Sequence, residues 1–163
     1  MTDFEGLLSR LNDSKVRFIV IGGAAATAHG SSRLTLDLDV VYERSPNNLK
    51  CLVSALKDLD PYLRGAPPGL PFRWDEVTLQ RGLNFTLTTR LGDLDILGEV
   101  TGGGSYQELE SHCVTLRVFG SQVQCLDLDT LIRVKRAAGR PKDFDAIAEL
   151  QRIHNLPGYD SKH

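Results

Sequence analysis

Two aspartates two residues apart, Asp37 and Asp39, are the side chains in this sequence best suited to chemistry. They lie in the segment Asp37–Tyr42, where acidic and apolar residues alternate at first, as in a β-strand. Residues two apart on a strand point to the same face, so both carboxylates would face one way and Leu38 and Val40 the other, toward the core. Two neighbouring carboxylates repel each other unless a cation lies between them. Mg²⁺ takes oxygen ligands, and the phosphate oxygens of a nucleotide would complete its shell, so the pair predicts a site for Mg²⁺ (or Mn²⁺).

A third carboxylate is expected from a second strand further along the chain. Residues 93–97, with the sequence Asp-Leu-Asp-Ile-Leu, again alternate acidic and apolar side chains. Asp95 has apolar neighbours on both sides, as Asp39 does, and a charged side chain in the middle of such a strand needs a partner. Asp93 shares its face but adjoins the turn at Gly92, so we expect it to be exposed. We therefore take Asp95 as the third residue of the site and Asp93 as the reserve.

Gly22-Gly23 forms a candidate phosphate-binding turn. It follows the apolar run 16–21, which predicts a buried strand, and it adjoins the alanine-rich stretch 24–29, which predicts a short helix. Glycine lets the backbone approach a phosphate closely, and the amides at the start of a helix favour anions. Arg33, between this turn and the aspartates, offers a charge-assisted hydrogen bond to a triphosphate, and it would equally suit a solvated loop.

Lys135 continues an apolar stripe near the end of the chain. It shares one face of the predicted helix Leu128–Ala138 with Leu128, Leu131 and Ile132, so this face should be directed toward the rest of the protein. A lysine at such a position reaches either a buried anion or the solvent, and the sequence leaves both interpretations open.

The elements that must position these residues follow from hydrophobic periodicity. We expect helices over residues 4–15, 24–29, 46–60, 74–80, 106–109, 128–138 and 141–154, and strands over 16–21, 37–42, 83–88, 93–97, 114–118 and 122–126. This order predicts an α/β (α+β) fold, in which a mixed central sheet is flanked by helices and two C-terminal helices close the chain.

The bulk composition fits one globular domain. The 163 residues are 41% hydrophobic and 25% charged, and we expect a single domain over 1–163, with a core at about 16–126 and a helical pair at about 127–155. The net charge of −2 argues against a broadly basic nucleic-acid-binding surface. Three cysteines without C-x-x-C spacing argue against a disulfide framework and a cysteine zinc site. Since the N-terminus lacks the features of a signal peptide and the apolar runs are short, we expect a cytoplasmic protein with no membrane partner.

Other enzyme classes lack their motifs in this sequence. A Rossmann fingerprint needs G-x-G-x-x-G, and Ala24 stands where its second glycine should be. No G-K-[ST] follows a glycine-rich loop, which excludes a P-loop protein, and no nucleophile elbow supports serine or cysteine hydrolysis.

The pattern of apolar-Gly-Gly, then Asp-x-Asp, then a later strand aspartate resembles the nucleotidyltransferase superfamily, which has the polymerase-beta-like fold. It looks most like the prokaryotic abortive-infection-type (AbiEii-like) branch and its small relatives. Residues 33–39 are similar to the Arg-x-Thr-x-Asp-x-Asp motif of that branch, and Lys135 with residues 140–143, Arg-Pro-Lys-Asp, to its terminal motif. The resemblance extends over about residues 18–150. It departs at Gly23, where catalytic members often have serine.

The resemblance implies a complete set of site residues. The metal ligands and catalytic residues would be Asp37, Asp39 and Asp95, with Asp95 also helping to activate the acceptor hydroxyl. The nucleoside triphosphate would be bound by Gly22, Gly23, Arg33, Thr35 and Lys135. The reaction would be the transfer of an NMP from an NTP to a hydroxyl, with release of pyrophosphate and two metal ions at the site.

The same resemblance implies what the acceptor and the partners would be. The acceptor hydroxyl would belong to a tRNA or a protein, and the protein would be a component of a toxin–antitoxin pair or of phage defence. Larger members carry a further C-terminal domain for the acceptor. We therefore expect acceptor binding here to involve a cognate partner protein, a dimer mate or a small acceptor.

Two interpretations without catalysis remain open from the sequence. Asp37 and Asp39 would also suit an exposed edge strand with no ligand. The domain would also suit a binding or regulatory module that keeps the fold and acts through a partner protein without turnover.

Overall fold

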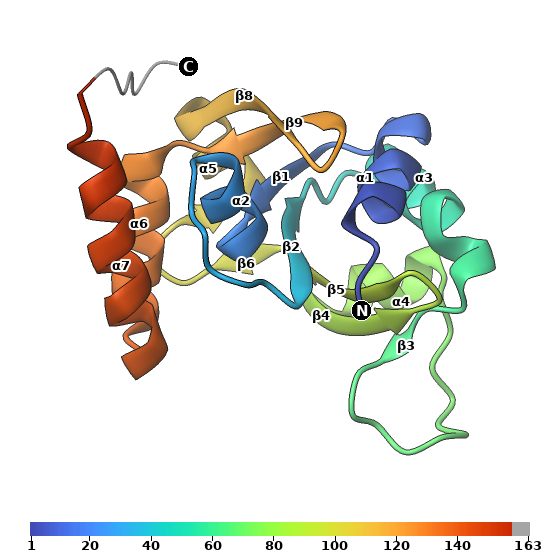
Figure 1. Cartoon of the computed structure of the whole chain (residues 1–163). Coiled ribbons are helices and arrows are strands. Elements are labelled where there is room, and N and C mark those ends of the chain that lie inside the picture. Colours follow the sequence, from blue (N-terminus) through green and yellow to red (C-terminus); the bar gives the residue numbers. More distant parts are fainter. Residues whose placement is uncertain (158–163) are drawn as a thin grey trace.

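The structure, a computed structural model, describes residues 1–157 and has an α/β architecture built on a seven-stranded sheet (Figure 1). The α-helices are α1 (Phe4–Asp13), α2 (Gly22–Ala28), α3 (Pro46–Leu56), α4 (Glu76–Arg81), α5 (Tyr106–Leu109), α6 (Leu128–Ala138) and α7 (Pro141–His154). Two short 3-10 helices are η1 (Lys57–Leu59) and η2 (Glu110–His112). The strands are β1 (Phe18–Ile21), β2 (Asp37–Tyr42), β3 (Tyr62–Leu63), β4 (Asn84–Thr89), β5 (Gly92–Leu97), β6 (Glu99–Val100), β7 (Gly104–Ser105), β8 (Cys113–Val118) and β9 (Ser121–Leu126).

The main sheet is mixed, as the sequence predicted. Its strand order is β3-β4-β5-β2-β1-β9-β8, and β6 with β7 forms a separate two-stranded sheet. The pairs β2–β5 and β1–β9 are parallel, whereas the other neighbours in the main sheet are antiparallel. The two central strands, β2 and β1, therefore each have one parallel and one antiparallel partner.

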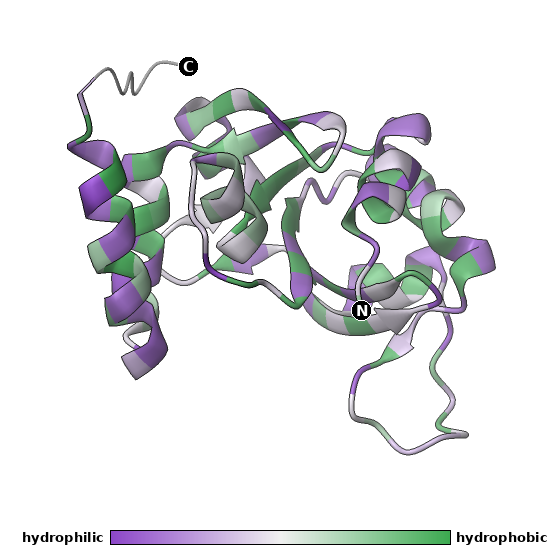
Figure 2. Ribbon diagram, in the orientation of Figure 1, coloured by the Kyte–Doolittle hydropathy of each residue, from purple (hydrophilic) through white to green (hydrophobic). Residues whose placement is uncertain are grey.

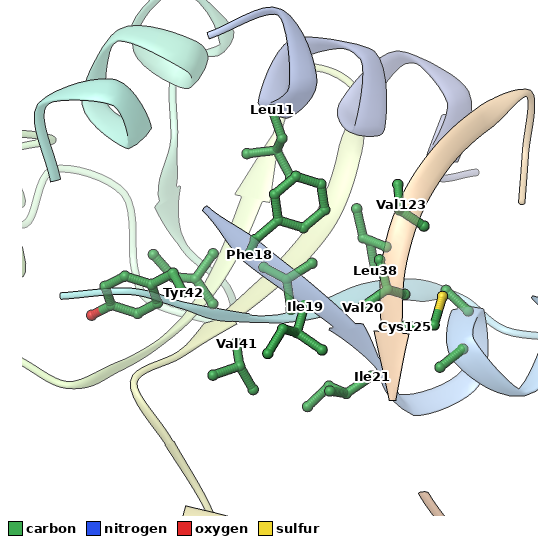
Figure 3. Packing of buried hydrophobic residues seen from close by; sticks show 14 of the residues in the cluster. Leu11, Phe18, Ile19, Val20, Ile21, Leu38, Val41, Tyr42, Val123 and Cys125 are labelled. Atoms are coloured by element: carbon green, nitrogen blue, oxygen red, sulfur yellow. The ribbon is translucent and has the colours of Figure 1, made fainter. Parts of the chain in front are cut away.

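The core is centred on these two strands. All four residues of β1 are buried, and in β2 the side chains of Leu38 and Val40 are fully buried, as the alternation predicted. Figure 3 shows the β1 side chains packed beside Leu38, with Leu11 of α1 above them and Cys125 of β9 alongside. This apolar packing fixes β2 in place and leaves the alternate β2 residues on the opposite face.

The helices lie on two sides of the sheet. Helix α1 packs against α3 on one side, and α2 packs against α6, which in turn packs against α7 (Figure 1). Helix α7 carries hydrophilic and hydrophobic residues on different faces, as Figure 2 shows, and its buried residues include Ala146, Ile147 and Leu150. A sharp break separates α6 from α7, because Gly139 has the positive φ of 66° that favours glycine.

Most predicted elements are confirmed, whereas several bounds and the shortest elements differ. Helix α2 begins at Gly22 rather than at residue 24, because the glycines themselves form its first turn. Helix α4 begins at Glu76 rather than at residue 74, since the Asp75 side chain accepts a hydrogen bond from the Thr78 amide and caps the helix there. Strands β3, β6 and β7 were not predicted, because two residues are too few to show a period.

Among residues 1–157, none of the helices combines the length and the apolar character that crossing a membrane requires.

Candidate active site

Three aspartates converge where β2 and β5 run side by side. The two strands are parallel and in register, with Asp37 opposite Asp93 and Asp39 opposite Asp95. One carboxylate oxygen from each of Asp37, Asp39 and Asp95 lies within 4.8 Å of the others, a spacing at which a single cation can contact all three. The structure thus brings together the three carboxylates that the sequence pattern selected.

The carboxylates repel one another strongly in this arrangement. Burial raises the pKa of Asp39 to about 8, and the neighbouring charges of Asp37 and Asp95 act in the same direction. Burial also raises the pKa of Asp95, and the nearby Arg64 guanidinium opposes that rise. Asp39 Oδ1 is buried and has no hydrogen-bond partner among the described residues. A buried, unpaired carboxylate oxygen facing two more carboxylates fits a divalent cation with oxygen ligands.

The glycine turn passes directly beside Asp39. Gly22 has a φ of 63°, and a Cβ at this position would overlap Asp39 Oδ2. A Cβ on Gly23 would overlap Thr35 Oγ1, which donates a hydrogen bond of 3.2 Å to the Asp37 carbonyl oxygen. Both glycines are therefore required by close approach, and Thr35 belongs to the local packing that holds β2 against this turn.

The triad lines a cleft with a cavity volume of about 320 Å³. Four basic residues line the same cleft, namely Arg33, Lys135, Arg140 and Lys142. Three clustered carboxylates and four basic side chains in one cleft suit an anionic ligand that reaches the carboxylates through a cation.

Lys135 lines this cleft from α6, so its position agrees with the anion-facing alternative that its helical face left open. Burial lowers its pKa, whereas the charges of Asp143 and Asp39 raise it. Arg140 is held by Asp143, whose carboxylate accepts a hydrogen bond of 2.8 Å from the Arg140 Nε and which closes the capping box of α7. Arg33 is exposed on the loop that leads into β2. The cleft is thus walled by both the α2–β2 connection and the helical pair α6–α7.

Arg64 is a residue at the site that sequence reasoning missed. It follows β3 directly, and its guanidinium donates hydrogen bonds of 2.7 Å to both Asp95 Oδ1 and the Leu87 carbonyl oxygen. It also lies 3.8 Å from Asp37 Oδ2 and 3.5 Å from Asp93 Oδ1. No spacing in the sequence connects Arg64 with these carboxylates, because the connection is made through the edge pairing of β3 with β4.

Asp93 lies beside the triad but outside it. Its side chain is 39% exposed, compared with 20% for Asp95, and its nearest charged partner is Arg64. The preference for Asp95 over Asp93 therefore agrees with the geometry, although Asp93 is less exposed than its place beside the Gly92 turn predicted.

Comparison with known proteins identifies the arrangement of elements. No protein-family model and no curated protein sequence matches the chain. Solved structures do: the antibiotic-resistance factor ANT(2″)-Ia in complex with adenylyl-2″-tobramycin is similar with a TM-score of 0.58 and 13% identity, covering 91% of this chain and 89% of that one. A candidate nucleotidyltransferase from Thermotoga maritima gives a TM-score of 0.55 and 13% identity, covering 90% of this chain and 88% of that one.

A third similar structure is an antigenic nucleotidyltransferase-like protein from Paracoccidioides brasiliensis, with a TM-score of 0.53 and 16% identity over 96% of this chain and 77% of that one. At these identities the likeness concerns the fold. The chain has the nucleotidyltransferase fold that the sequence motifs implied.

Proposed function

We propose that this protein is a metal-dependent nucleotidyltransferase that moves an NMP from an NTP to a hydroxyl group. The observation that carries the proposal is the convergence of Asp37, Asp39 and Asp95 within 4.8 Å in a cleft that four basic residues also line. The nucleotidyltransferase fold adds support at the level of the scaffold, since a fold alone does not determine function.

The three aspartates would hold Mg²⁺ or Mn²⁺ as oxygen ligands. The unpaired Asp39 Oδ1 and the raised pKa of Asp39 both describe a carboxylate without a counter-charge of its own, which a divalent cation would supply. When bound, such a cation would neutralise the carboxylates and stabilise charge on the phosphate that reacts.

The basic residues of the cleft would bind the triphosphate. Lys135 and Arg33 provide positive charge there, and Gly22 and Gly23 line the same cleft without side chains of their own, so a phosphate would meet their backbone directly. Thr35 would contribute by holding the start of β2 against Gly23.

The reaction would be an in-line displacement. The acceptor oxygen forms a bond to the α-phosphorus, the bond from that phosphorus to the pyrophosphate oxygen breaks, and the hydroxyl proton passes to Asp95. Asp95 suits this role because burial raises its pKa and so makes its carboxylate a better proton acceptor.

We further propose that the chain acts as one domain, with α6 and α7 as a wall of the site. The abortive-infection-type motif at residues 33–39 extends the proposal in three ways. The acceptor would be a tRNA or protein hydroxyl, the chain would act with a cognate partner protein, and its role would lie in a toxin–antitoxin pair or in phage defence.

Calorimetric titration tests the nucleotide site. Each of the four nucleoside triphosphates is titrated into wild type and Asp39→Asn, with and without Mg²⁺. The proposal is supported if binding requires Mg²⁺ and weakens at least about tenfold in the variant. A tenfold change is what the loss of about one charged contact would cause. A folded wild-type protein that binds no triphosphate would contradict it and would favour a regulatory module that acts through a partner.

Transfer is then tested with triphosphates labelled at the α-phosphate. Label on tRNA or on protein identifies the acceptor, and Asp95→Asn should abolish that label. Nucleotide binding without label on either acceptor contradicts the proposed transfer to these two classes.

A further inference from the structure

The Arg64 guanidinium contacts the carboxylate cluster where a divalent cation would bind. We infer that Arg64 is a built-in counter-ion that competes with the divalent cation for the site, so that cation binding requires its guanidinium to withdraw. The inference rests on the proposed metal site and adds a residue that sets the cation concentration at which that site fills.

The guanidinium spans two of the three carboxylates. One of its terminal nitrogens donates to Asp95 Oδ1 at 2.7 Å, and the other lies 3.8 Å from Asp37 Oδ2. A cation held by both Asp37 and Asp95 would have to occupy the space between their carboxylates, which is the space that the guanidinium fork faces. Like charges do not share such a position, so the two occupants exclude or weaken each other.

Arg64 leaves the third carboxylate without a partner. No contact joins it to Asp39 in the described residues, and Asp39 Oδ1 has no hydrogen-bond partner there. A single guanidinium charge therefore compensates the cluster only in part, whereas a divalent cation can contact all three carboxylates. When a divalent cation replaces the guanidinium, the charge of the three carboxylates is neutralised more completely.

The position that Arg64 takes is imperfect, which makes its withdrawal feasible. Within residues 1–157, its buried Nε has no hydrogen-bond partner, because the nearest carboxylate oxygen, on Asp93, lies 3.5 Å away. By contrast, Arg140 donates to Asp143 from two nitrogens, at 2.8 and 3.3 Å. Arg64 thus lacks the paired hydrogen bonds that make an arginine–carboxylate contact strong.

The chain around Arg64 allows the side chain to leave without unfolding the sheet. The Arg64 amide donates to the Thr86 carbonyl oxygen at 2.9 Å, which anchors its backbone to β4. The side chain is 28% exposed, and within the described part of the chain withdrawal breaks only its contacts with the carboxylates and its 2.7 Å hydrogen bond to the Leu87 carbonyl oxygen. A rotation about the flexible side chain is therefore enough to move the guanidinium toward solvent.

Mn²⁺ binding, followed by the electron paramagnetic resonance signal of the free ion, tests this competition without any measurement of activity. We compare wild type with Arg64→Gln, which removes the charge, and with Arg64→Lys, which keeps the charge but cannot span two carboxylates. Arg10→Gln is the matched control, because it removes the same charge from an ion pair with Asp58 that lies outside the site.

Competition predicts that Arg64→Gln binds Mn²⁺ about tenfold more tightly than wild type, as expected when one opposing charge leaves a partly exposed site. Arg64→Lys should lie between the two, and it also serves if Arg64→Gln does not fold. Arg10→Gln should match wild type.

The other outcomes overturn the inference in distinguishable ways. Equal or weaker Mn²⁺ binding in both Arg64 variants, with clear binding in wild type, removes the competition and leaves the proposed metal site intact. Absence of Mn²⁺ binding in every folded variant contradicts both the inference and the proposed function.

Discussion

Gly22 and Asp39 lie so close together that any side chain at Gly22 would overlap the Asp39 carboxylate. The backbone of Gly22 also has a φ of 63°, which residues with a Cβ rarely adopt. Two separate constraints therefore require glycine here, one from the backbone and one from the site. They can be distinguished by substitution, because other glycines in the chain have only one of them.

Gly22→Ala should abolish Mg²⁺-dependent triphosphate binding and lower the free energy of unfolding by more than about 1 kcal/mol, since strain and overlap add. Gly65→Ala is the control, because Gly65 has a φ of 80° but no atom within 4 Å of the place that an alanine Cβ would take. Calorimetric binding and thermal unfolding measure both effects. If the two variants lose equal stability and both bind nucleotide, the close contact between Gly22 and Asp39 is not needed for nucleotide binding.

Asp39→Asn should stabilise the metal-free protein, and increasingly so as the pH rises. The pKa of Asp39 is 3.8 as a free group and about 8 in the folded chain. Between these two values the folded state holds a proton that the unfolded state has lost, so wild type loses stability progressively as the pH rises from the lower value through the higher one. Asparagine has no titratable group in this range, so the stability of Asp39→Asn does not fall with pH for this reason.

The measurement is the difference in Tm between Asp39→Asn and wild type from about pH 5 to about pH 8.5 in chelator, a window that ends just above the folded pKa. We expect the difference to grow by the equivalent of at least about 2 kcal/mol, since each pKa unit is worth about 1.4 kcal/mol. Saturating Mg²⁺ should favour wild type and reduce the difference. A difference that stays constant over this pH range would contradict the electrostatic account.

Much of the site could be predicted because its residues follow periodic patterns. The alternation in Asp37–Tyr42 placed two carboxylates on one face, and apolar neighbours on both sides distinguished Asp95 from Asp93. Helical spacing placed Lys135 on the face of α6 that meets the cleft. In each case the period of a strand or of a helix connects sequence to direction in space.

Arg64 could not be predicted because no such period leads to it. It follows a strand of only two residues, and its contact with Asp95 depends on the order of strands β3, β4 and β5 in the sheet. Strand order comes from long-range pairing, which a local pattern does not contain. The start of α2 at Gly22 was missed for a related reason, since glycine is a weak helix former and close approach to Asp39 selects it there.

Asp95→Asn should remove Mn²⁺ binding almost completely, whereas Asp93→Asn should change the affinity by no more than about threefold, since charges at exposed positions are screened. Asp93 carries the same charge on the same face of β5 but lies outside the 4.8 Å cluster and is more exposed. Measuring Mn²⁺ affinity in both variants thus separates coordination from the general effect of negative charge. Similar losses in both would mean that charge alone attracts the cation.

Lys135→Met should weaken triphosphate binding at least about tenfold and leave the fold stable, because methionine suits the half-buried position on α6 and only the cation is lost. Arg136→Met is the matched control, since Arg136 lies on the same helix and does not line the cleft. Calorimetric titration with Mg²⁺ and the preferred triphosphate measures both. Equal effects of the two substitutions would assign Lys135 to the general surface charge.

The parallel pairing of β2 with β5 also bears on how the chain folds. Strands β4 and β5 form a local hairpin, but β5 reaches β2 only across a long stretch of chain, and such long-range pairings form late. That pairing brings Asp95 against Asp39, so in the absence of a cation it must overcome charge repulsion or take up a proton on Asp39. A divalent cation would then speed the strand pairing in addition to serving as a cofactor. Mg²⁺ should therefore accelerate refolding more in wild type than in Asp39→Asn.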